Sequence, residues 1–274
     1  MTDDSKRTHE LTRIALGVEY DGSRFRGWQI QEPGVRTIQE CLERALSAVA
    51  DHRVTTVCAG RTDAGVHSLG QVIHFDTHAQ RVSRAWVLGV NAHLPPDVNV
   101  LWGQQVPATF HARFSALTRH YRYVVLNRSV RSALQRQRAT RYYQPLDAER
   151  MNEAARYLVG EHDFNAFRSR HCQAENPVRT VYALTIVRQG EYVVLDIEAN
   201  AFLHHMVRNI AGVLLAIGCG EQPKHWARQV LAGRDRQLGG VTAPPEGLYL
   251  MSVRYASIMR LPRPTNQHLS IPRT

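Results

Sequence analysis

A glycine-rich stretch between two apolar runs contains residue types that could act on a substrate. It reads AGRTDAGVH, covers residues 59–67, and places Asp63 two positions after Arg61. A carboxylate is ionised at neutral pH, and a nearby guanidinium lowers its pKa further and orients its oxygens. Gly60 and Gly65 permit positive φ and a close approach of a ligand. The stretch could present a carboxylate to a substrate, although its spacing alone favours a surface turn with an ion pair.

Arginines and aromatic residues alternate in a second segment, ARFSALTRHYRYVVLN at residues 112–127. Arginines can hold phosphate while a ring stacks on a base at about 1–3 kcal/mol per base, a combination that suits single-stranded RNA. In a strand, Tyr121 and Tyr123 share one face and Arg122 lies on the other. Both tyrosines could instead fill the core, which is the interpretation we prefer for Tyr123.

A third segment, FLHHMVRNIAGVLLAIG at residues 202–218, predicts a helix with a broad apolar stripe. His204 and Arg208 are four residues apart and share a face beside that stripe, so Arg208 could line a cleft or lie in solvent over apolar surface. The His204–His205 pair raises the question of a metal, but H-E-x-x-H, C-x-x-C and a close carboxylate pair are all missing. Dinucleotide and P-loop motifs are missing too. We therefore predict neither a metal site nor a nucleotide cofactor.

These segments must be positioned by strands and helices whose order repeats once along the chain. In the first half, apolar periodicity predicts strands at 11–20, 54–58, 66–75 and 98–106 and helices at 37–49 and 83–93. In the second half it predicts strands at 120–126, 178–187 and 192–199 and helices at 148–158 and within 202–218. We expect an α+β fold of two similar subdomains, 1–109 and 110–274, with a joined mixed or antiparallel sheet and helices largely on one side.

Composition narrows the class of partner. The 274 residues include 34 Lys and Arg against 24 Asp and Glu, a net charge of +10. Such an excess suggests a polyanionic partner, although a general compositional bias would also produce it. The arginine-rich segment 128–141 predicts a mobile loop that either grips phosphate or is merely solvated.

Cysteine usage and hydropathy bear on the compartment. The four cysteines stand far apart, which favours reduced thiols. No apolar signal core or membrane-length run is present, so we expect a cytoplasmic protein. The proline-interrupted tail at 261–274 is expected to lie across the surface or to be disordered.

Five motifs in order resemble the tRNA pseudouridine synthase A family: GRTDAGVH, FHARFSA, HYRY, FLHHMVRN and APPEGLYL. The resemblance extends from VEYDGSRFRGWQ near the start to EGLYL at residues 246–250. It implies a pseudouridine synthase fold, a homodimer with a basic cleft, and isomerisation of uridine to pseudouridine at positions 38, 39 and 40 of the tRNA anticodon stem-loop. The reaction involves no redox change and no energy donor, so the resemblance implies no cofactor.

The resemblance also implies roles for individual residues. Asp63 would be the nucleophile, attacking C6 of the base or C1′ of the ribose. Arg208 would pair with Asp63, and Arg61 would hold the space left by the flipped nucleotide or its phosphate. Tyr121 would stack on the target base and is a candidate for proton transfer, while Leu248 would pack on the other face of the uracil. Further RNA contacts are expected from Arg24, Arg26, Arg113, Arg119 and Arg122.

Two other classes of function are open on the residues alone. A non-catalytic tRNA-binding or chaperone protein could keep the cleft without turnover, but the presence of Asp63, Tyr121 and Arg208 favours an enzyme. A metal-dependent hydrolase or deaminase acting on RNA bases would need bound zinc and would be sensitive to chelators.

Overall fold

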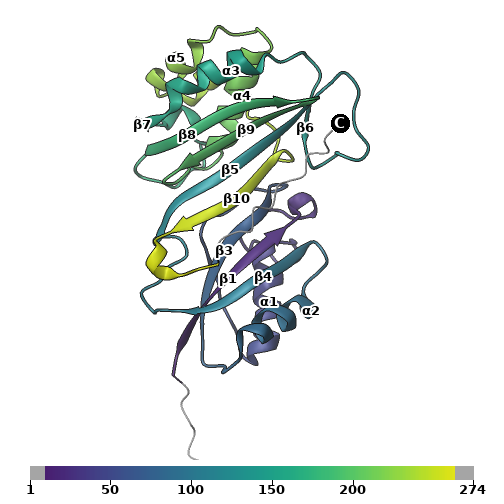
Figure 1. Ribbon diagram of the computed structural model, residues 1–274, viewed down its shortest axis with the longest axis vertical. Coiled ribbons are helices and arrows are strands. Elements are labelled where there is room, and N and C mark those ends of the chain that lie inside the picture. Colours follow the sequence, from purple (N-terminus) through teal and green to yellow (C-terminus); the bar gives the residue numbers. More distant parts are fainter. Residues whose placement is uncertain (1–9, 263–274) are drawn as a thin grey trace, which may run out of the picture.

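The computed structural model describes residues 10–262, and its centre is one ten-stranded sheet (Figure 1). The strands follow the order β4 (Val98–Val106), β1 (Thr12–Tyr20), β3 (His67–Thr77), β10 (Leu248–Tyr255), β5 (Ala116–Asn127), β9 (Tyr192–Ala199), β8 (Val178–Gln189) and β7 (Gly160–Asp163). In addition, β2 (Val57–Cys58) pairs with β3 and β6 (Thr140–Tyr142) pairs with β5. Only the β10–β3 and β5–β6 pairings are parallel among these described strands. The predicted α+β fold with a joined, mixed sheet is confirmed.

Strand β10 joins the two halves of the sheet. It runs antiparallel to β5 and parallel to β3, where Tyr249 faces His67 and Leu250 faces Ser68. Because β3 begins at His67, the last residue of the glycine-rich stretch, and β5 carries Tyr121, strand β10 brings the motifs GRTDAGVH, HYRY and EGLYL side by side.

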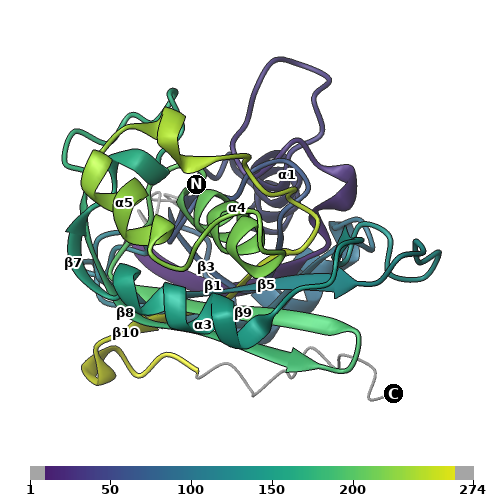
Figure 2. The same cartoon turned by 90° about the horizontal axis from the view of Figure 1, so that it is seen from above.

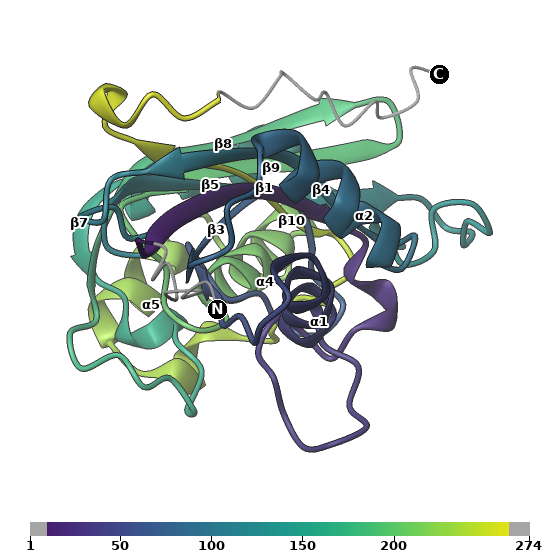
Figure 3. The same cartoon turned by 90° about the horizontal axis from the view of Figure 1, so that it is seen from below.

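The helices that cover the sheet lie mainly on one side. Figures 2 and 3 show α1 (Ile38–Ala50), α4 (Met206–Gly218) and α5 (Trp226–Gly233) on the same face. The remaining helices are α2 (Val90–His93), which continues a π-helical stretch at Ala85–Gly89, and α3 (Ala148–Ala155). Short 3₁₀ turns occupy Gly22–Arg24, Arg156–Leu158, Asn165–Phe167, Arg236–Gly239 and Ser257–Met259.

Helix α1 forms where its amphipathic pattern meets a capping residue. The Thr37 hydroxyl accepts the backbone N–H of Glu40 at 3.4 Å and so caps the N-terminus of the helix. The apolar face of α1, which includes Leu42 and Leu46, is fully buried against Leu16 of β1 and its neighbours. Truncating one such leucine to alanine typically costs about 2–5 kcal/mol, so this contact fixes the first half of the sheet.

Helix α4 is apolar on almost every side because it is the central element of the second core. Ile210, Val213, Leu214 and Ile217 are at most 1% exposed and pack in the same cluster as Met151 of α3. No helix within residues 10–262 is long and apolar enough to cross a membrane.

Most predicted boundaries agree with the structure, and the differences have local causes. The strands at 98–106 and 192–199 are confirmed, whereas the strand predicted at 54–58 was too long, since only Val57–Cys58 pairs with β3. The helix predicted at 148–158 ends at Ala155 and continues as a 3₁₀ turn. The expectation for the tail lies almost wholly outside the described residues.

Candidate active site

The loop that carries Asp63 is fixed by contacts with residues 20–28. The Thr62 hydroxyl and the Tyr20 hydroxyl are hydrogen-bonded at 2.8 Å, and the Trp28 N–H donates to the Thr62 carbonyl at 3.0 Å. The loop also closes on itself, since the Val66 N–H donates to the Asp63 carbonyl at 3.1 Å. Asp63 therefore lies on a turn whose backbone is fixed on both sides.

Two glycines allow this turn to pack closely. Gly65 has a φ of +79°, and a Cβ there would lie 3.1 Å from Cγ of Pro245. Gly27 has a φ of +95°, and its Cβ would lie 2.8 Å from the Thr62 carbonyl oxygen. Gly60 is not among the positive-φ glycines of the described chain, and a Cβ there would make an ordinary 3.7 Å contact with the Tyr121 hydroxyl. Of the two glycines in the motif, only Gly65 adopts the positive φ that glycine permits.

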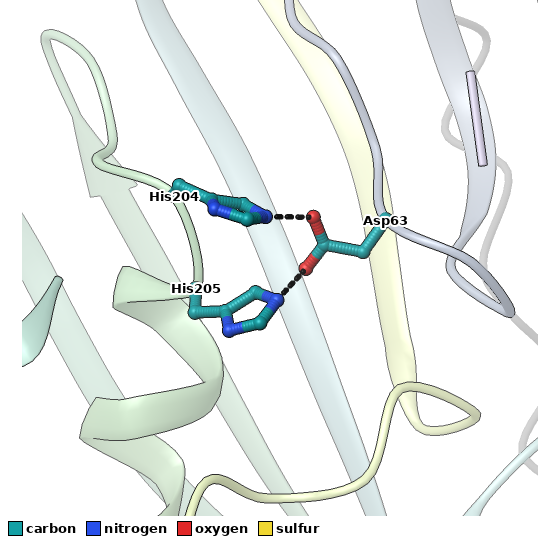
Figure 4. Close-up of side chains that lie close together, drawn as sticks. All are labelled: Asp63, His204 and His205. Carbon is teal, nitrogen blue, oxygen red and sulfur yellow. Dashed lines mark ion pairs between the residues drawn. The ribbon is translucent and has the colours of Figure 1, made fainter. Parts of the chain in front are cut away.

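Three cationic or hydrogen-bonding groups surround the Asp63 carboxylate. Arg208 Nη1 donates to Oδ2 at 3.2 Å, which is the pairing that the resemblance implied. Figure 4 shows the other two: His204 Nε2 lies 3.2 Å from Oδ1, and His205 Nε2 lies 3.3 Å from Oδ2. The Asp63 side chain is 22% exposed, so the carboxylate is held on one side and open to solvent on another.

These neighbours decide the charge of the carboxylate. Burial alone would raise the pKa of Asp63, but the hydrogen bond from His204 and the charges of His205 and Arg208 outweigh it, so the pKa is lowered. Burial lowers the pKa of His205, against the attraction of Asp63. At neutral pH the site therefore holds an ionised carboxylate within reach of a permanent cation.

The start of α4 brings these side chains to Asp63. His205 immediately precedes the helix and has a φ of +64°, a left-handed conformation that is uncommon for any residue except glycine. The prediction that His204 and Arg208 share a helix face is therefore wrong, because α4 begins only at Met206. Both side chains nevertheless contact Asp63, His204 from the chain before the helix and Arg208 from its first turn.

The segment after Gly240 secures the first turn of α4. Arg208 Nε donates to the Ala243 carbonyl at 2.8 Å, and the Ala243 N–H donates to the Arg208 carbonyl at 3.1 Å. Asn209, which is 1% exposed, donates to the Phe167 carbonyl at 2.7 Å and accepts the Thr242 hydroxyl at 2.7 Å. This buried network fixes the angle at which Arg208 reaches Asp63.

Tyr121 and Leu248 lie on the same face of the sheet. Tyr121 is 7% exposed and packs edge-to-face on Phe202 with ring centroids 5.1 Å apart. Burial, with the charges of Tyr20 and Asp63, raises the pKa of Tyr121, so its phenol keeps its proton at neutral pH. Leu248 faces Tyr123 across the β10–β5 pair. Tyr123 is fully buried, which confirms its predicted place in the core.

The arginines expected to contact RNA separate into two groups. Four of them are exposed: Arg24, Arg26, Arg61 and Arg113. Arg119 is only 7% exposed and donates to the carbonyls of Ala59 at 3.0 Å and Asn200 at 2.7 Å. These bonds hold the guanidinium between β5 and residue 59, so an RNA contact by Arg119 stays a prediction and would require the guanidinium to leave these carbonyls.

Arg122 is not brought to the carboxylate site. It alternates with Tyr121 on β5, so its side chain lies on the opposite face of the sheet. Its Nε and Nη2 each donate to Asp196 at 3.0 Å, and His120 on the same face lies 2.7 Å from that carboxylate. An RNA contact by Arg122 stays a prediction, and it would have to be made on the other side of the sheet.

His204 and His205 are the site residues that sequence reasoning missed. The pair is visible in FLHHMVRN, but it belongs to no H-E-x-x-H or C-x-x-C motif and has no close carboxylate pair in the sequence. The carboxylate comes from a loop 145 residues before Arg208. The ligand atoms of Asp63, His204 and His205 all lie within 4.8 Å of one another, so within the described chain these residues form a group able to hold a metal ion.

The site thus combines an arginine-paired carboxylate on a fixed turn with a buried tyrosine nearby, in an α+β fold. A family model described as tRNA pseudouridine synthase matches residues 17–115 and 154–256, and the chain belongs to this family, whose members isomerise uridine to pseudouridine. Three curated relatives carry the name tRNA pseudouridine synthase A. The relative from Nitrosococcus oceani is 60% identical, that from Alcanivorax borkumensis 57%, and that from Pseudomonas aeruginosa 56%.

These relatives match almost from end to end. Each alignment covers 92% of this chain, together with 96%, 94% and 88% of the three relatives in the same order. Among solved structures, a Cbf5–Nop10–Gar1 complex matches 74% of this chain and 45% of that chain, with 11% identity and a TM-score of 0.32. That likeness is too weak to support a comparison of sites.

Proposed function

We propose that this chain isomerises uridine to pseudouridine in tRNA, at positions 38, 39 and 40 of the anticodon stem-loop, with Asp63 as the nucleophile. The observation that carries the proposal is the 3.2 Å contact between Asp63 and Arg208, which unites the motifs GRTDAGVH and FLHHMVRN in a chain of this family. The names of the relatives support tRNA as the substrate.

Substrate entry would begin with a uridine leaving its stack, at a cost of a few kcal/mol. The exposed arginines of the loop after β1 and of the Asp63 turn, Arg24, Arg26 and Arg61, are suited to offset this cost by holding phosphates. The flipped base would lie between the ring of Tyr121 and the side chain of Leu248. Arg61 would occupy or hold the space that the nucleotide leaves.

The chemistry then needs only groups that the chain provides. The Asp63 carboxylate would form a bond to C6 of the base or to C1′ of the ribose, and the C1′–N1 bond would break. The uracil turns, C1′ bonds to C5, the C5 proton is lost, and the carboxylate leaves again. N1 ends with a proton, so the product is an isomer of the substrate and no oxidant or energy donor is consumed. Tyr121 is our candidate for moving the C5 proton.

We extend the proposal to assembly and location. The chain would act as a cytoplasmic homodimer with a basic cleft, and its subdomains would divide at 109/110. Two observations support this division. The family model matches in two blocks, 17–115 and 154–256, and the site residues lie on both sides of β10. The net charge of +10 supports a nucleic-acid partner.

The test is incubation of the purified protein with unmodified tRNA in a chelating buffer, followed by mapping of pseudouridine. We expect product at positions 38, 39 and 40 where uridine stands there. Tight tRNA binding without product would favour the non-catalytic alternative. Activity that disappears with the chelator and returns with zinc would favour a metalloenzyme.

A further inference from the structure

We propose that Asp63, His204 and His205 form a reversible Zn²⁺ site, and that zinc bound there withdraws Asp63 from catalysis. Binding itself depends only on the three side chains, whereas the loss of turnover rests on the proposed function of Asp63. The nucleophile would thus be open to inhibition by a transition metal although the reaction needs none.

The spacing of the three side chains fits a small tetrahedral ion. With Zn–N and Zn–O bonds of about 2.0–2.1 Å, two ligand atoms at a tetrahedral centre lie about 3.3 Å apart. His204 Nε2 lies 3.2 Å from Oδ1 and His205 Nε2 lies 3.3 Å from Oδ2, and one ligand atom from each of the three residues falls within 4.8 Å of the others (Figure 4). A cation can therefore take the central position with small side-chain rotations.

The backbone holds the ligands in place before any ion arrives. His205 has the left-handed φ of +64°, which directs the chain at the head of α4 toward the Asp63 turn. The turn is fixed by the Tyr20–Thr62 hydrogen bond and by the Val66 N–H. Such unusual backbone conformations occur preferentially at functional sites, and ligands already in place lose less entropy when a metal binds.

The site is also accessible and selective by its chemistry. Asp63, His204 and His205 are 22%, 40% and 28% exposed at their side chains, so a hydrated ion can reach them and keep water at its fourth position. Two imidazoles and one carboxylate suit Zn²⁺, whereas Mg²⁺ and Ca²⁺ prefer oxygen ligands. Zinc should therefore bind and magnesium, which accompanies tRNA, should not.

One neighbour opposes the metal and provides a distinctive test. The Arg208 guanidinium lies 3.2 Å from Asp63 Oδ2 and is held there by the Ala243 carbonyl. A dication bound to Asp63 would be repelled by this charge. Arg208→Gln should therefore tighten zinc binding, although the same change should weaken catalysis.

The binding test uses the full-length, tag-free protein and Zn²⁺ alone, in competition with a chromophoric zinc chelator. We expect His204→Gln and His205→Asn each to weaken the tightest zinc site by at least about tenfold. Asparagine is chosen because it tolerates the left-handed backbone at position 205. His225→Gln, at an exposed histidine before α5, is the matched control and should leave the affinity unchanged. Arg208→Gln should increase the affinity severalfold.

The proposed zinc site is overturned if zinc affinity is equal in the wild type, His204→Gln and His205→Asn. It is also overturned if Arg208→Gln binds zinc more weakly than the wild type. The inhibition is tested by single-turnover pseudouridine formation with and without zinc, with reversal by EDTA. Zinc that binds as proposed but leaves turnover unchanged would overturn the inhibition. If the protein forms no pseudouridine but the variants change zinc affinity as expected, the proposed function is refuted and the zinc site is supported.

Discussion

Replacing Arg208 with methionine should separate the positioning of Asp63, the proposed nucleophile, from the folding of the helix that carries the arginine. Methionine keeps an apolar stem in the space between α4 and the segment at Ala243 but removes both guanidinium contacts. These are the 3.2 Å bond to Asp63 Oδ2 and the 2.8 Å bond to the Ala243 carbonyl. Because the Arg208 side chain is only 14% exposed, water will not fully replace either bond.

The magnitude follows from the type of bond that is lost. A hydrogen bond to a charged group contributes about 1.5–3 kcal/mol. If the contact with Asp63 contributes this much in the transition state, the rate of the chemical step should fall by about 10–150-fold. The lost bond to Ala243 should lower the free energy of unfolding by about 1–3 kcal/mol, which leaves most of a typical domain's stability in place.

The assay is release of tritium from tRNA labelled at C5 of uridine, under single-turnover conditions, because the C5 hydrogen is lost only when the new bond forms. Binding of the same tRNA and chemical unfolding are measured alongside. Arg228→Met, at an exposed arginine of α5, is the matched control and should behave like the wild type. A chemical step within threefold of the wild type in folded Arg208→Met would refute the idea that this arginine holds the nucleophile.

Three further predictions test the base platform, the turn and the loop that packs beside it. Tyr121→Phe keeps the ring but not the hydroxyl, so tRNA binding should persist while turnover falls about 10²–10⁴-fold if the phenol moves a proton; unchanged turnover would restrict it to stacking. Gly65→Ala forces a side chain into a φ of +79° and to 3.1 Å from Pro245, so denaturant unfolding should show a loss of about 1–2 kcal/mol; wild-type stability would contradict the strain. The hydrogen bond from His67 is the main cause that lowers the pKa of Asp21. The ionised Asp21 carboxylate therefore stabilises the fold above about pH 4. Asp21→Asn should lower the free energy of unfolding by roughly 1 kcal/mol at pH 7 after screening, and this loss should shrink as the pH falls. A loss of stability that grows in acid would contradict the lowered pKa of Asp21.

Elements set by local patterns were predictable from the sequence. Helix α1 follows from the Thr37 cap and one apolar face, and β4 and β9 follow from alternation within a single strand. Strand β10 does not follow from its motif EGLYL, because its existence depends on partners at β3 and β5 that lie far away in the sequence. The predicted helix includes His204, whereas α4 begins at Met206, because no local sequence pattern predicts the left-handed backbone of His205.

The site shows the same division between local and distant information. The residue types of Asp63 and Arg208 and the motifs around them indicated the chemistry, but the contacts of His204 and His205 with the carboxylate depend on how α4 meets the Asp63 turn. Arg119 is a second example. Its position among aromatics suggested RNA, whereas its burial under main-chain carbonyls follows only from the packing of β5 against residues 59 and 200.

The most direct test of the central claim is Asp63→Asn, which is nearly isosteric but lacks a carboxylate nucleophile. In single-turnover reactions with unmodified tRNA, we expect no pseudouridine above background, while tRNA affinity stays within a few-fold of the wild type. Pseudouridine formed by folded Asp63→Asn at a rate within tenfold of the wild type would contradict the assignment of Asp63 as the nucleophile.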